Sequence, residues 1–405
     1  MKSAAITNIG TLVSGDIGQP VLEADTILIE DGKISKIGTR QEVDTQGVEM
    51  LIDANGMTVT PGLIDPHTHP LIGDWSPRQK VMGWMDATLN GGVTTTMSQG
   101  EVVVQGRPTD PMGVKALAIL ACKAYQNYRP SGLKHHGGAI ILEKGLVEAD
   151  FKEMAEHGVW LVAEVGGSGL VDIEDTREMF VWARKYGFKI PMHCGGPSIP
   201  GSSRTDAQMI IDSNPDMVAH VNGGATSARF DDILRLIDET RLPLEIIYNG
   251  NPKAAYKVVD WLRERDQLDR VFFGSDTPIG IGHIPLAIVR TIVQISSLNE
   301  IPAAQAIAMA SGNTARAYGM KRGMLSEGWE ADLLVMDFPH SCAADSALGA
   351  IERGDNPAIG MIMVDGELLS TRARNAPGAT RGIKINGVEA LAPGLHEYLF
   401  GAKSA

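Results

Sequence analysis

The stretch that decides the fold is VTPGLIDPHTH, residues 59–69 of this chain of 405 amino acids. It begins as an apolar run bounded by turn-forming residues, which is typical of a buried strand. It ends in two histidines, His67 and His69, that are two positions apart. Successive side chains of an extended chain point to opposite faces, so both imidazoles lie on the same side. The stretch therefore predicts a buried strand with two imidazoles at its carboxyl end.

A regular alternation of short apolar runs and longer segments continues this pattern along the chain. The eight expected strands are 57–65, 92–98, 139–143, 159–165, 189–193, 217–221, 244–248 and 271–275. Helical spacing of apolar residues fills the intervals, for example at 231–239 and 255–265. Alternating strands and helices pair in parallel through right-handed crossovers, and eight such units over about 250 residues suit a closed barrel. The sequence thus predicts an α/β fold with a (β/α)8 TIM-like barrel.

The two ends of the chain have a different texture, with short alternating strands separated by turns. An Asp31-Gly32 pair lies between two alternating runs, which is a strong hairpin signal. Similar runs return at 331–337 and 360–369. We therefore expect both chain ends to combine into one β domain. The expected division is residues 1–60 plus 321–385 for the β domain, 61–320 for the barrel and 386–405 for a C-terminal tail.

The composition excludes several classes of function. The chain has 36 Lys and Arg residues against 49 Asp and Glu residues, a formal net charge of −13. No nucleic-acid partner is expected, because such an acidic chain lacks the basic surface that replaces counterions on nucleic acid. No run approaches the roughly 18 apolar residues of a membrane span, so we expect no membrane association and a cytoplasmic location.

Polar residues stand at the carboxyl ends of five of the expected strands, and these ends meet at one mouth of a barrel. The six candidates are His67, His69, Glu164, His193, His220 and Asp276. Burying them without a shared partner would cost on the order of several kcal/mol per ion, because an unpaired charge is poorly solvated inside a protein. Imidazole and carboxylate are ligands that suit zinc and iron. The sequence therefore predicts a site for two divalent metal ions.

The stretch TPGLIDPHTHP at 60–70, together with the other four candidate ligands, resembles the amidohydrolase superfamily over essentially the whole chain. This resemblance implies a (β/α)8 barrel with a small β-sandwich domain formed by both chain ends. It also implies a ligand set in which His67, His69 and Asp276 hold one metal, His193 and His220 hold the other, and Glu164 bridges both.

One position departs from the commonest pattern of that superfamily. Hydantoinases and dihydroorotases bridge their metals with a carboxylated lysine at the end of strand four, whereas Glu164 stands there and 159–165 contain no lysine. The departure counts against the hydantoinase subtype. Zinc is the expected metal, and iron or manganese is the alternative at one position because their ligand sets overlap.

Three further segments narrow the expected activity. GDWSPRQK at 73–80, SIPGSS at 198–203 and VNGG at 221–224 are similar to superfamily members that open nicotinate-derived cyclic enamides. The resemblance implies that the protein hydrolyses 6-oxo-1,4,5,6-tetrahydronicotinate to 2-formylglutarate and ammonia, and that it is a homotetramer.

The two metal ions suggest how such a reaction would proceed. A metal pair can lower the pKa of a shared water toward about 7 and polarise a carbonyl. Asp276 is expected to take the proton of the attacking water and pass it to the leaving nitrogen.

A small-molecule substrate of this kind carries a carboxylate, for which arginine is the best protein partner. Arg78, on the loop after strand one, is the first candidate for this contact, with Arg204 and Lys253 as alternatives. Ser202 and Ser203 are candidate hydrogen-bond donors, and His283, on the loop after strand eight, is a further candidate substrate contact.

Two other functions stay open on the sequence alone. The same metal site could serve an aminohydrolase that deaminates a purine-like or other heterocycle, because a fold does not determine its chemistry. The other possibility is a catalytically silent barrel that binds or assembles with other proteins. Superfamily members of that kind typically lose their metal ligands, whereas this chain keeps all six candidates.

Overall fold

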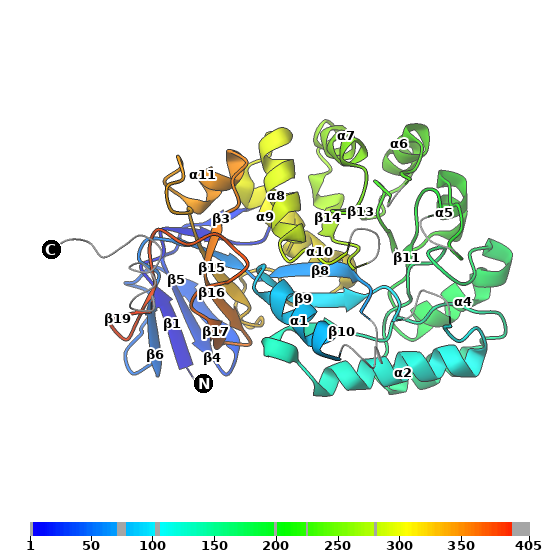
Figure 1. The fold of residues 1–405 in the computed structure, drawn as a ribbon, viewed down its shortest axis with the longest axis horizontal. Coiled ribbons are helices and arrows are strands. Elements are labelled where there is room, and N and C mark those ends of the chain that lie inside the picture. The colour runs from blue at the N-terminus through cyan, green and yellow to red at the C-terminus, as the bar shows by residue number, and fades with distance from the viewer. Residues whose placement is uncertain are drawn as a thin grey trace.

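The structure is a computed structural model that describes residues 3–70, 78–101, 106–197, 201–223, 226–278 and 282–390, with 78–82 and 130 described by backbone alone. The described chain is an α/β protein with four sheets. Two larger sheets lie at one end of the molecule in Figure 1, and two smaller parallel sheets lie toward the other end among most of the helices.

The two larger sheets contain six strands each. The first has the order β19 (Val388–Glu389), β18 (Lys384–Ile385), β6 (Met50–Asp53), β1 (Ser3–Thr7), β4 (Thr26–Glu30), β5 (Lys33–Gly38). The second has the order β17 (Glu367–Ser370), β16 (Ala358–Val364), β15 (Leu333–Asp337), β7 (Thr58–Pro61), β2 (Thr11–Val13), β3 (Val21–Leu22).

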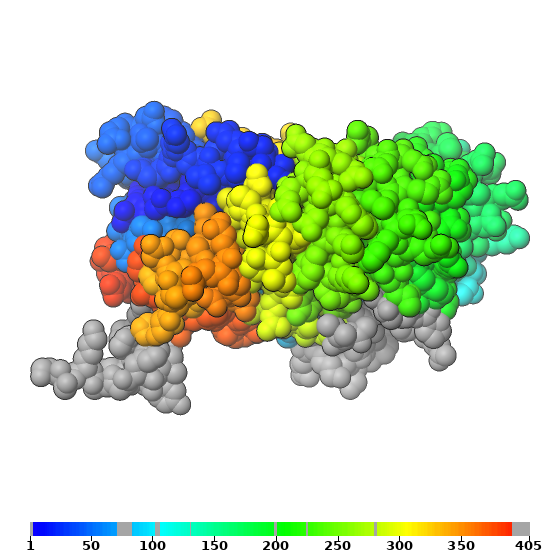
Figure 2. Space-filling view, turned by 90° about the horizontal axis from the view of Figure 1, so that it is seen from above, coloured from blue at the N-terminus to red at the C-terminus, as the bar shows by residue number. Residues whose placement is uncertain are grey.

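Strands from both ends of the chain are interleaved in these two sheets. β15 pairs antiparallel with β7, and β18 pairs antiparallel with β6. One hydrophobic cluster, which includes Ile6, Val59 and Val335, joins side chains of both sheets. Figure 2 shows the blue N-terminal and orange to red C-terminal residues packed together at one end. The antiparallel pairing of β4 with β5 confirms the hairpin predicted at Asp31-Gly32.

The expected C-terminal tail begins inside a hairpin of the first sheet. β19 pairs antiparallel with β18, so residues 388 and 389 belong to the sheet and not to a tail. The turn is held to the sheet on both sides, because Asn386 donates its backbone N–H to Leu51 and accepts the N–H of Leu51 on its side chain. Residues 391–405 lie outside the described residues.

The expected first strand, 57–65, is divided at Gly62, which corrects the prediction. β7 belongs to the second sheet, whereas β8 (Leu63–Thr68) pairs in parallel with β9 (Val93–Ser98). The N–H of Gly62 donates to the carbonyl of Asp332, 2.8 Å away, and a Cβ at Gly62 would lie 2.2 Å from Thr94 Oγ1. Only glycine fits at this position, because the chain passes from one sheet to the other in close contact with Thr94.

The two smaller sheets are parallel and carry the other strands. β8, β9 and β10 (Lys134–His136) form one. The other contains β11 (Pro191–Met192), β12 (Met217–Val218), β13 (Leu244–Ile247) and β14 (Val271–Gly274). Parallel bridges continue the pairing between them, namely Ile140 with Val162, Leu161 with Lys189, Val165 with Met192 and Thr68 with Thr277.

The third strand begins earlier than the expected 139–143. β10 covers Lys134–His136, and Gly137 and Gly138 separate it from the bridge at Ile140. Its polar residues have partners within the fold, because Lys134 lies among carboxylates and His135 Nδ1 bonds Thr96 Oγ1 at 2.8 Å. Polar composition therefore concealed this strand in the sequence.

Helices separate most of these strands and cover them on the outside (Figure 1). They are α1 (Arg78–Leu89), α2 (Pro111–Asn127), α3 (Glu148–Glu156), α4 (Ile173–Lys185), α5 (Ala207–Ser213), α6 (Phe230–Glu239), α7 (Pro252–Arg263), α8 (Ala287–Leu298), α9 (Ala303–Met309), α10 (Gly312–Tyr318) and α11 (Ala347–Glu352). α6 and α7 confirm the helices predicted near 231–239 and 255–265. No helix in the described residues is long and apolar enough to cross a bilayer.

Candidate metal centre

The structure brings all six candidate ligands together at the carboxyl ends of the parallel strands. His67 lies in β8 and His69 just after it. Glu164 lies between the bridged residues Val162 and Val165, and His193, His220 and Asp276 come within two residues of the ends of β11, β12 and β14. All six are buried, with exposures of 0 to 9%. The end of β8 is tied to the chain after β14, because the N–H of Asp276 donates to His67 O and that of His69 to Thr277 O, both at 2.9 Å. We call these six residues the candidate metal centre.

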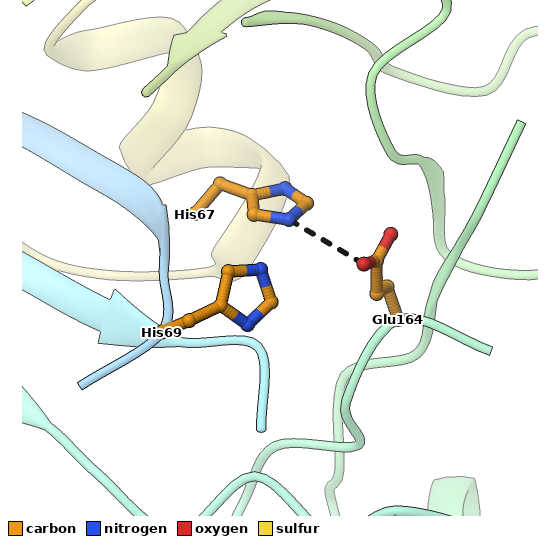
Figure 3. A group of neighbouring side chains, drawn as sticks. All are labelled: His67, His69 and Glu164. Atoms are coloured by element: carbon orange, nitrogen blue, oxygen red, sulfur yellow. Dashed lines mark ion pairs between the residues drawn. The ribbon is translucent and has the colours of Figure 1, made fainter. Parts of the chain in front are cut away.

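One side of the candidate metal centre is formed by both histidines of the HxH pair. His69 Nε2 lies 3.1 Å and His67 Nε2 lies 3.6 Å from Asp276 Oδ1. His67 Nε2 also lies 3.8 Å from Glu164 Oε1, and Figure 3 shows both imidazoles and this carboxylate converging on one space. The ring nitrogens and carboxylate oxygens thus face each other at separations that leave room for an ion.

The other side contains the two histidines that follow β11 and β12. His220 Nε2 lies 2.7 Å and His193 Nδ1 lies 3.4 Å from Glu164 Oε2. His193 Nε2 lies 3.1 Å from the carbonyl of Gly196, which can only accept, so this nitrogen carries the proton. The free electron pair of His193 Nδ1 therefore faces inward. Glu164 presents one oxygen to each side.

The donor set fits a pair of divalent cations. Three overlapping groups have ligand atoms within 4.8 Å of one another: His67, His69 and Glu164; His67, His220 and Asp276; Glu164, His193 and His220. His67 Nε2 is buried without a hydrogen-bond partner, and His193 Nδ1 and His220 Nε2 face each other at 3.2 Å. Ring nitrogens in these positions need a proton or a metal between them, and imidazole with carboxylate is a set that zinc and iron accept.

The electrostatics of the candidate metal centre favour added positive charge. Burial opposes protonation of His67, but Glu245, Glu164 and Asp276 outweigh it and hold the pKa of the imidazole well above its ordinary value. Burial likewise opposes protonation of His220, and Glu164 nevertheless raises its pKa. Burial alone would raise the pKa of Glu164, yet the surrounding imidazoles hold it well below its usual value. The carboxylates therefore attract protons or cations to this site.

Two of the candidate ligands occupy the left-handed backbone region. The φ angles are 32° for His220 and 57° for Asp276, a conformation that residues other than glycine rarely adopt. Such local strain persists only where surrounding contacts hold it, and it is concentrated at functional sites. For Asp276 those contacts include Asn249 Nδ2, which donates to the Asp276 carbonyl at 2.7 Å.

Sequence reasoning missed Glu245, which contacts two of the candidate ligands. Its carboxylate Oε2 lies 2.8 Å from His67 Nδ1 and accepts the backbone N–H of His220 at 3.0 Å. The available signal was an acidic residue inside the apolar run Leu244–Ile247, where every residue is buried. A buried carboxylate in a strand needs a partner, and here the partners are metal-ligand candidates.

The three basic candidates for contact with the substrate carboxylate lie on or beside helices and loops outside the candidate metal centre. Arg78 is not on a loop but begins α1, and its side chain lies outside the described residues. Lys253 is exposed in the first turn of α7. Arg204 is exposed beside a hollow of about 300 Å³ that Gly195 and Gly196 also line.

The remaining three candidates lie on two loops. Ser202 and Ser203 are half-buried, and the N–H of Ser203 donates to Gly166 O at 2.8 Å, which joins this loop to the segment after Glu164. His283 packs against Trp84 with ring centroids 5.7 Å apart. Burial lowers the pKa of His283 to about 4, and neither ring nitrogen has a hydrogen-bond partner.

Comparison with known proteins identifies the family. A model described as the amidohydrolase family matches residues 58–369. The chain belongs to the amidohydrolase family. It is 49% identical to enamidase from Eubacterium barkeri over 385 residues, which cover 95% of this chain and the whole of that protein. Imidazolonepropionase from Bacillus cytotoxicus is 22% identical over 84% of this chain and 92% of its own length.

Solved structures of this family have the same fold. A crystal structure of enamidase matches with a TM-score of 0.91 at 49% identity, covering 95% of this chain and 100% of the other. D-Hydantoinase from Thermus sp. matches with a TM-score of 0.64 at 17% identity, covering 93% and 97%. The second likeness concerns the fold alone.

Proposed function

We propose that this amidohydrolase is an enamidase, a binuclear metal-dependent hydrolase that opens a cyclic enamide. The observation that carries the proposal is the 49% identity to an enamidase over the whole length of that protein. The six buried residues of the candidate metal centre support it with a suitable ligand set. The proposed reaction converts 6-oxo-1,4,5,6-tetrahydronicotinate to 2-formylglutarate and ammonia.

The proposal includes a (β/α)8 barrel with a β-sandwich made by both chain ends. The pairings of β8, β9 and β10, the bridges at Ile140, Leu161 and Val165, and the sheet from β11 to β14 support a continuous series. The bridge between Thr68 and Thr277 supports its return to β8. In such a barrel the carboxyl ends of the strands form the catalytic face.

We assign one metal position to His67, His69 and Asp276, the other to His193 and His220, and the bridging place to Glu164. Zinc is the proposed metal, with iron or manganese as the alternative at one position. When bound, such a pair supplies Lewis-acid polarisation of a carbonyl and lowers the pKa of water. The protein supplies the orientation of the ligands, through the buried contacts of the candidate metal centre.

Asp276 is the proposed proton carrier. Its backbone is held on both sides, by the bond from its N–H to His67 O and by Asn249 at its carbonyl, and its carboxylate lies 3.1 Å from His69 Nε2. The carboxylate accepts the proton of the attacking water as the C–O bond forms. It then donates that proton to the ring nitrogen as the amide C–N bond breaks. The released enamine tautomerises to an imine, and a second water yields the aldehyde and ammonia.

The direct test is an assay of the purified, metal-loaded protein with 6-oxo-1,4,5,6-tetrahydronicotinate. We expect one ammonia and one aldehyde for each ring opened, and no comparable turnover of dihydroorotate, hydantoin or adenine. Ammonia released from adenine, with the cyclic enamide left intact, would favour a deaminase instead. The homotetramer implied by the resemblance is part of the proposal and is measured by light scattering on the same preparation.

A further inference from the structure

Glu245 lies at a point where one carboxylate can act on two candidate metal ligands. It is the second residue of β13 and is only 1% exposed. A single oxygen, Oε2, serves both His67 Nδ1 at 2.8 Å and the backbone N–H of His220 at 3.0 Å. These partners come from two separate segments, β8 and the chain after β12.

The neighbouring strands leave a defined place for this side chain. The carbonyl of Glu245 accepts the N–H of Val221 at 2.9 Å, which fixes its backbone beside the His220 segment. Gly274 of β14 lies beside the carboxylate, and a Cβ at that position would come within 2.4 Å of Glu245 Oε1. The absence of a side chain at 274 therefore makes room for a carboxylate that reaches β8.

The contact with His67 determines which ring nitrogen is free. A carboxylate can only accept, so His67 Nδ1 carries the proton and donates it to Glu245. The electron pair of Nε2 then points toward Glu164 and Asp276. A carboxylate behind a ligating imidazole fixes its orientation and raises its basicity. The second histidine of the pair, His69, has no hydrogen-bond partner at Nδ1.

The contact with His220 supports a strained backbone. The φ angle of His220 is 32°, and its buried N–H would have no acceptor without Glu245. An unsatisfied buried amide costs about 1–3 kcal/mol, so the carboxylate favours the conformation that directs this imidazole inward. Asn222 adds a second attachment, because its side chain bonds both the N–H and the carbonyl of Ile247 at 2.9 Å.

We propose that Glu245 is the positioning residue of the metal centre, orienting His67 and holding the His220 turn so that both imidazoles are preorganised for the cations. This inference rests on the proposed function, because it requires that the centre binds metal. Glu245 does not touch the reacting atoms in this proposal. Its main effect falls on the position formed by His67, His69 and Asp276, since it contacts the ring of His67 but only the backbone of His220.

The test is metal affinity, measured by titrating zinc into metal-free protein in competition with a chromophoric chelator. We expect Glu245→Gln to weaken zinc binding by about 10–100-fold, the usual effect of removing a partner behind a metal ligand. We expect Glu245→Ala to weaken it further, because both donors lose their acceptor. Turnover of Glu245→Gln should recover substantially at saturating zinc, as a positioning role requires.

Asp337→Asn is the matched control. Asp337 is another fully buried carboxylate on a strand, β15, but it accepts hydrogen bonds from Arg381 and not from the metal centre. We expect this variant to unfold at lower denaturant concentration with unchanged zinc affinity. The near-isosteric Glu245→Gln carries the test if Glu245→Ala does not fold.

Two failures are distinguishable in this experiment. Wild-type affinity for zinc in Glu245→Gln would overturn the inference and leave the proposed function intact. Tight zinc binding by the wild type, weakened in Glu245→Gln but without turnover of the cyclic enamide, would support the role of Glu245 and overturn the proposed function.

Discussion

The candidate metal centre and the cluster around Lys134 both bring carboxylates close together, but they differ in what neutralises them. Glu330, Asp332 and Asp365 have oxygens within 4.8 Å of one another, as the ligand groups of the metal centre do. Lys134 Nζ lies 2.9 Å from both oxygens of Asp332 and 2.5 Å from Asp365, and it also contacts Glu330. This second cluster therefore already contains its cation.

The difference teaches what a cluster of carboxylates can indicate. An ammonium group on the chain neutralises the acids around Lys134 and joins β10 to the second larger sheet, next to β15 and β16. The candidate metal centre has imidazoles in place of an ammonium, and their ring nitrogens face the carboxylates at distances of 2.7 to 3.8 Å. Imidazoles that converge with the carboxylates, and not acidity by itself, distinguish a candidate site for an external cation from a structural ion-pair network.

Removing the cation should have the largest effect and should affect only one of the two clusters. Dialysis against a chelator is expected to abolish turnover, and zinc should restore it.

Substitution of the proposed proton carrier should also affect only the candidate metal centre. Asp276→Asn should reduce kcat by about 10²–10⁴-fold, the range that proton transfer contributes. Initial rates on the cyclic enamide provide the measurement. Asp365→Asn is the control from the Lys134 cluster and should retain wild-type kcat; equal losses in both variants would contradict the distinction.

Removing the internal cation should affect stability and not metal binding. Lys134→Met removes the ammonium group from this cluster. Arg322 still pairs with Glu330 and Arg129 with Asp365, but Asp332, which is only 3% exposed, loses its ion pair. Loss of one partner of a buried ion pair costs about 3–5 kcal/mol of the free energy of unfolding. Urea unfolding followed by circular dichroism measures this change, with zinc content determined on the same samples. A variant with wild-type stability would show that the network contributes nothing to the fold.

Histidines without carboxylate neighbours extend the comparison. Burial lowers the pKa of His135 to about 3, the opposite direction from His67. Because His135 binds its proton less well when folded, stability is full above about pH 6.5 and is lost as the pH falls toward 3. Between pH 7 and pH 5 this group should remove about 2 kcal/mol from the free energy of unfolding.

His135→Gln isolates that contribution and can keep the hydrogen bond to Thr96. Its free energy of unfolding should fall less steeply between pH 7 and pH 5 than that of the wild type. The exposed His157, changed to Gln, is the control and should leave the slope unchanged. Identical slopes for wild type and His135→Gln would rule out His135 as a source of acid sensitivity.

The smallest expected effect lies at the outer edge of the Lys134 cluster. The side chain of Glu330 is 32% exposed, whereas that of Asp332 is 2% exposed. Glu330→Gln should therefore change the free energy of unfolding by no more than about 1 kcal/mol, as for partly exposed ion pairs. Asp332→Asn should cost clearly more in the same urea titration. The reverse order would mean that burial does not rank the members of this network.

Much of the metal centre could be predicted because its signals are local. An HxH pair after an apolar run and single polar residues after other runs are visible in a linear sequence, and parallel strands end at one edge. Arg78 shows the limit of this reasoning, since its side chain lies outside the described residues and its contact with substrate stays a prediction. Glu245 could not be assigned, because an acid within an apolar run does not reveal its partners.

The amino-acid order alone determined which residues are apolar, which are potential ligands and how far apart they lie, and that sufficed for the α/β class and the six ligand candidates. Only the tertiary structure decided that Gly62 divides the first stretch between two sheets, that Lys134 supplies its own cluster with a cation and that Glu245 reaches His67. Local periodicity is encoded by neighbours in the chain, whereas pairings across 178 to 270 positions arise only when distant segments share one core.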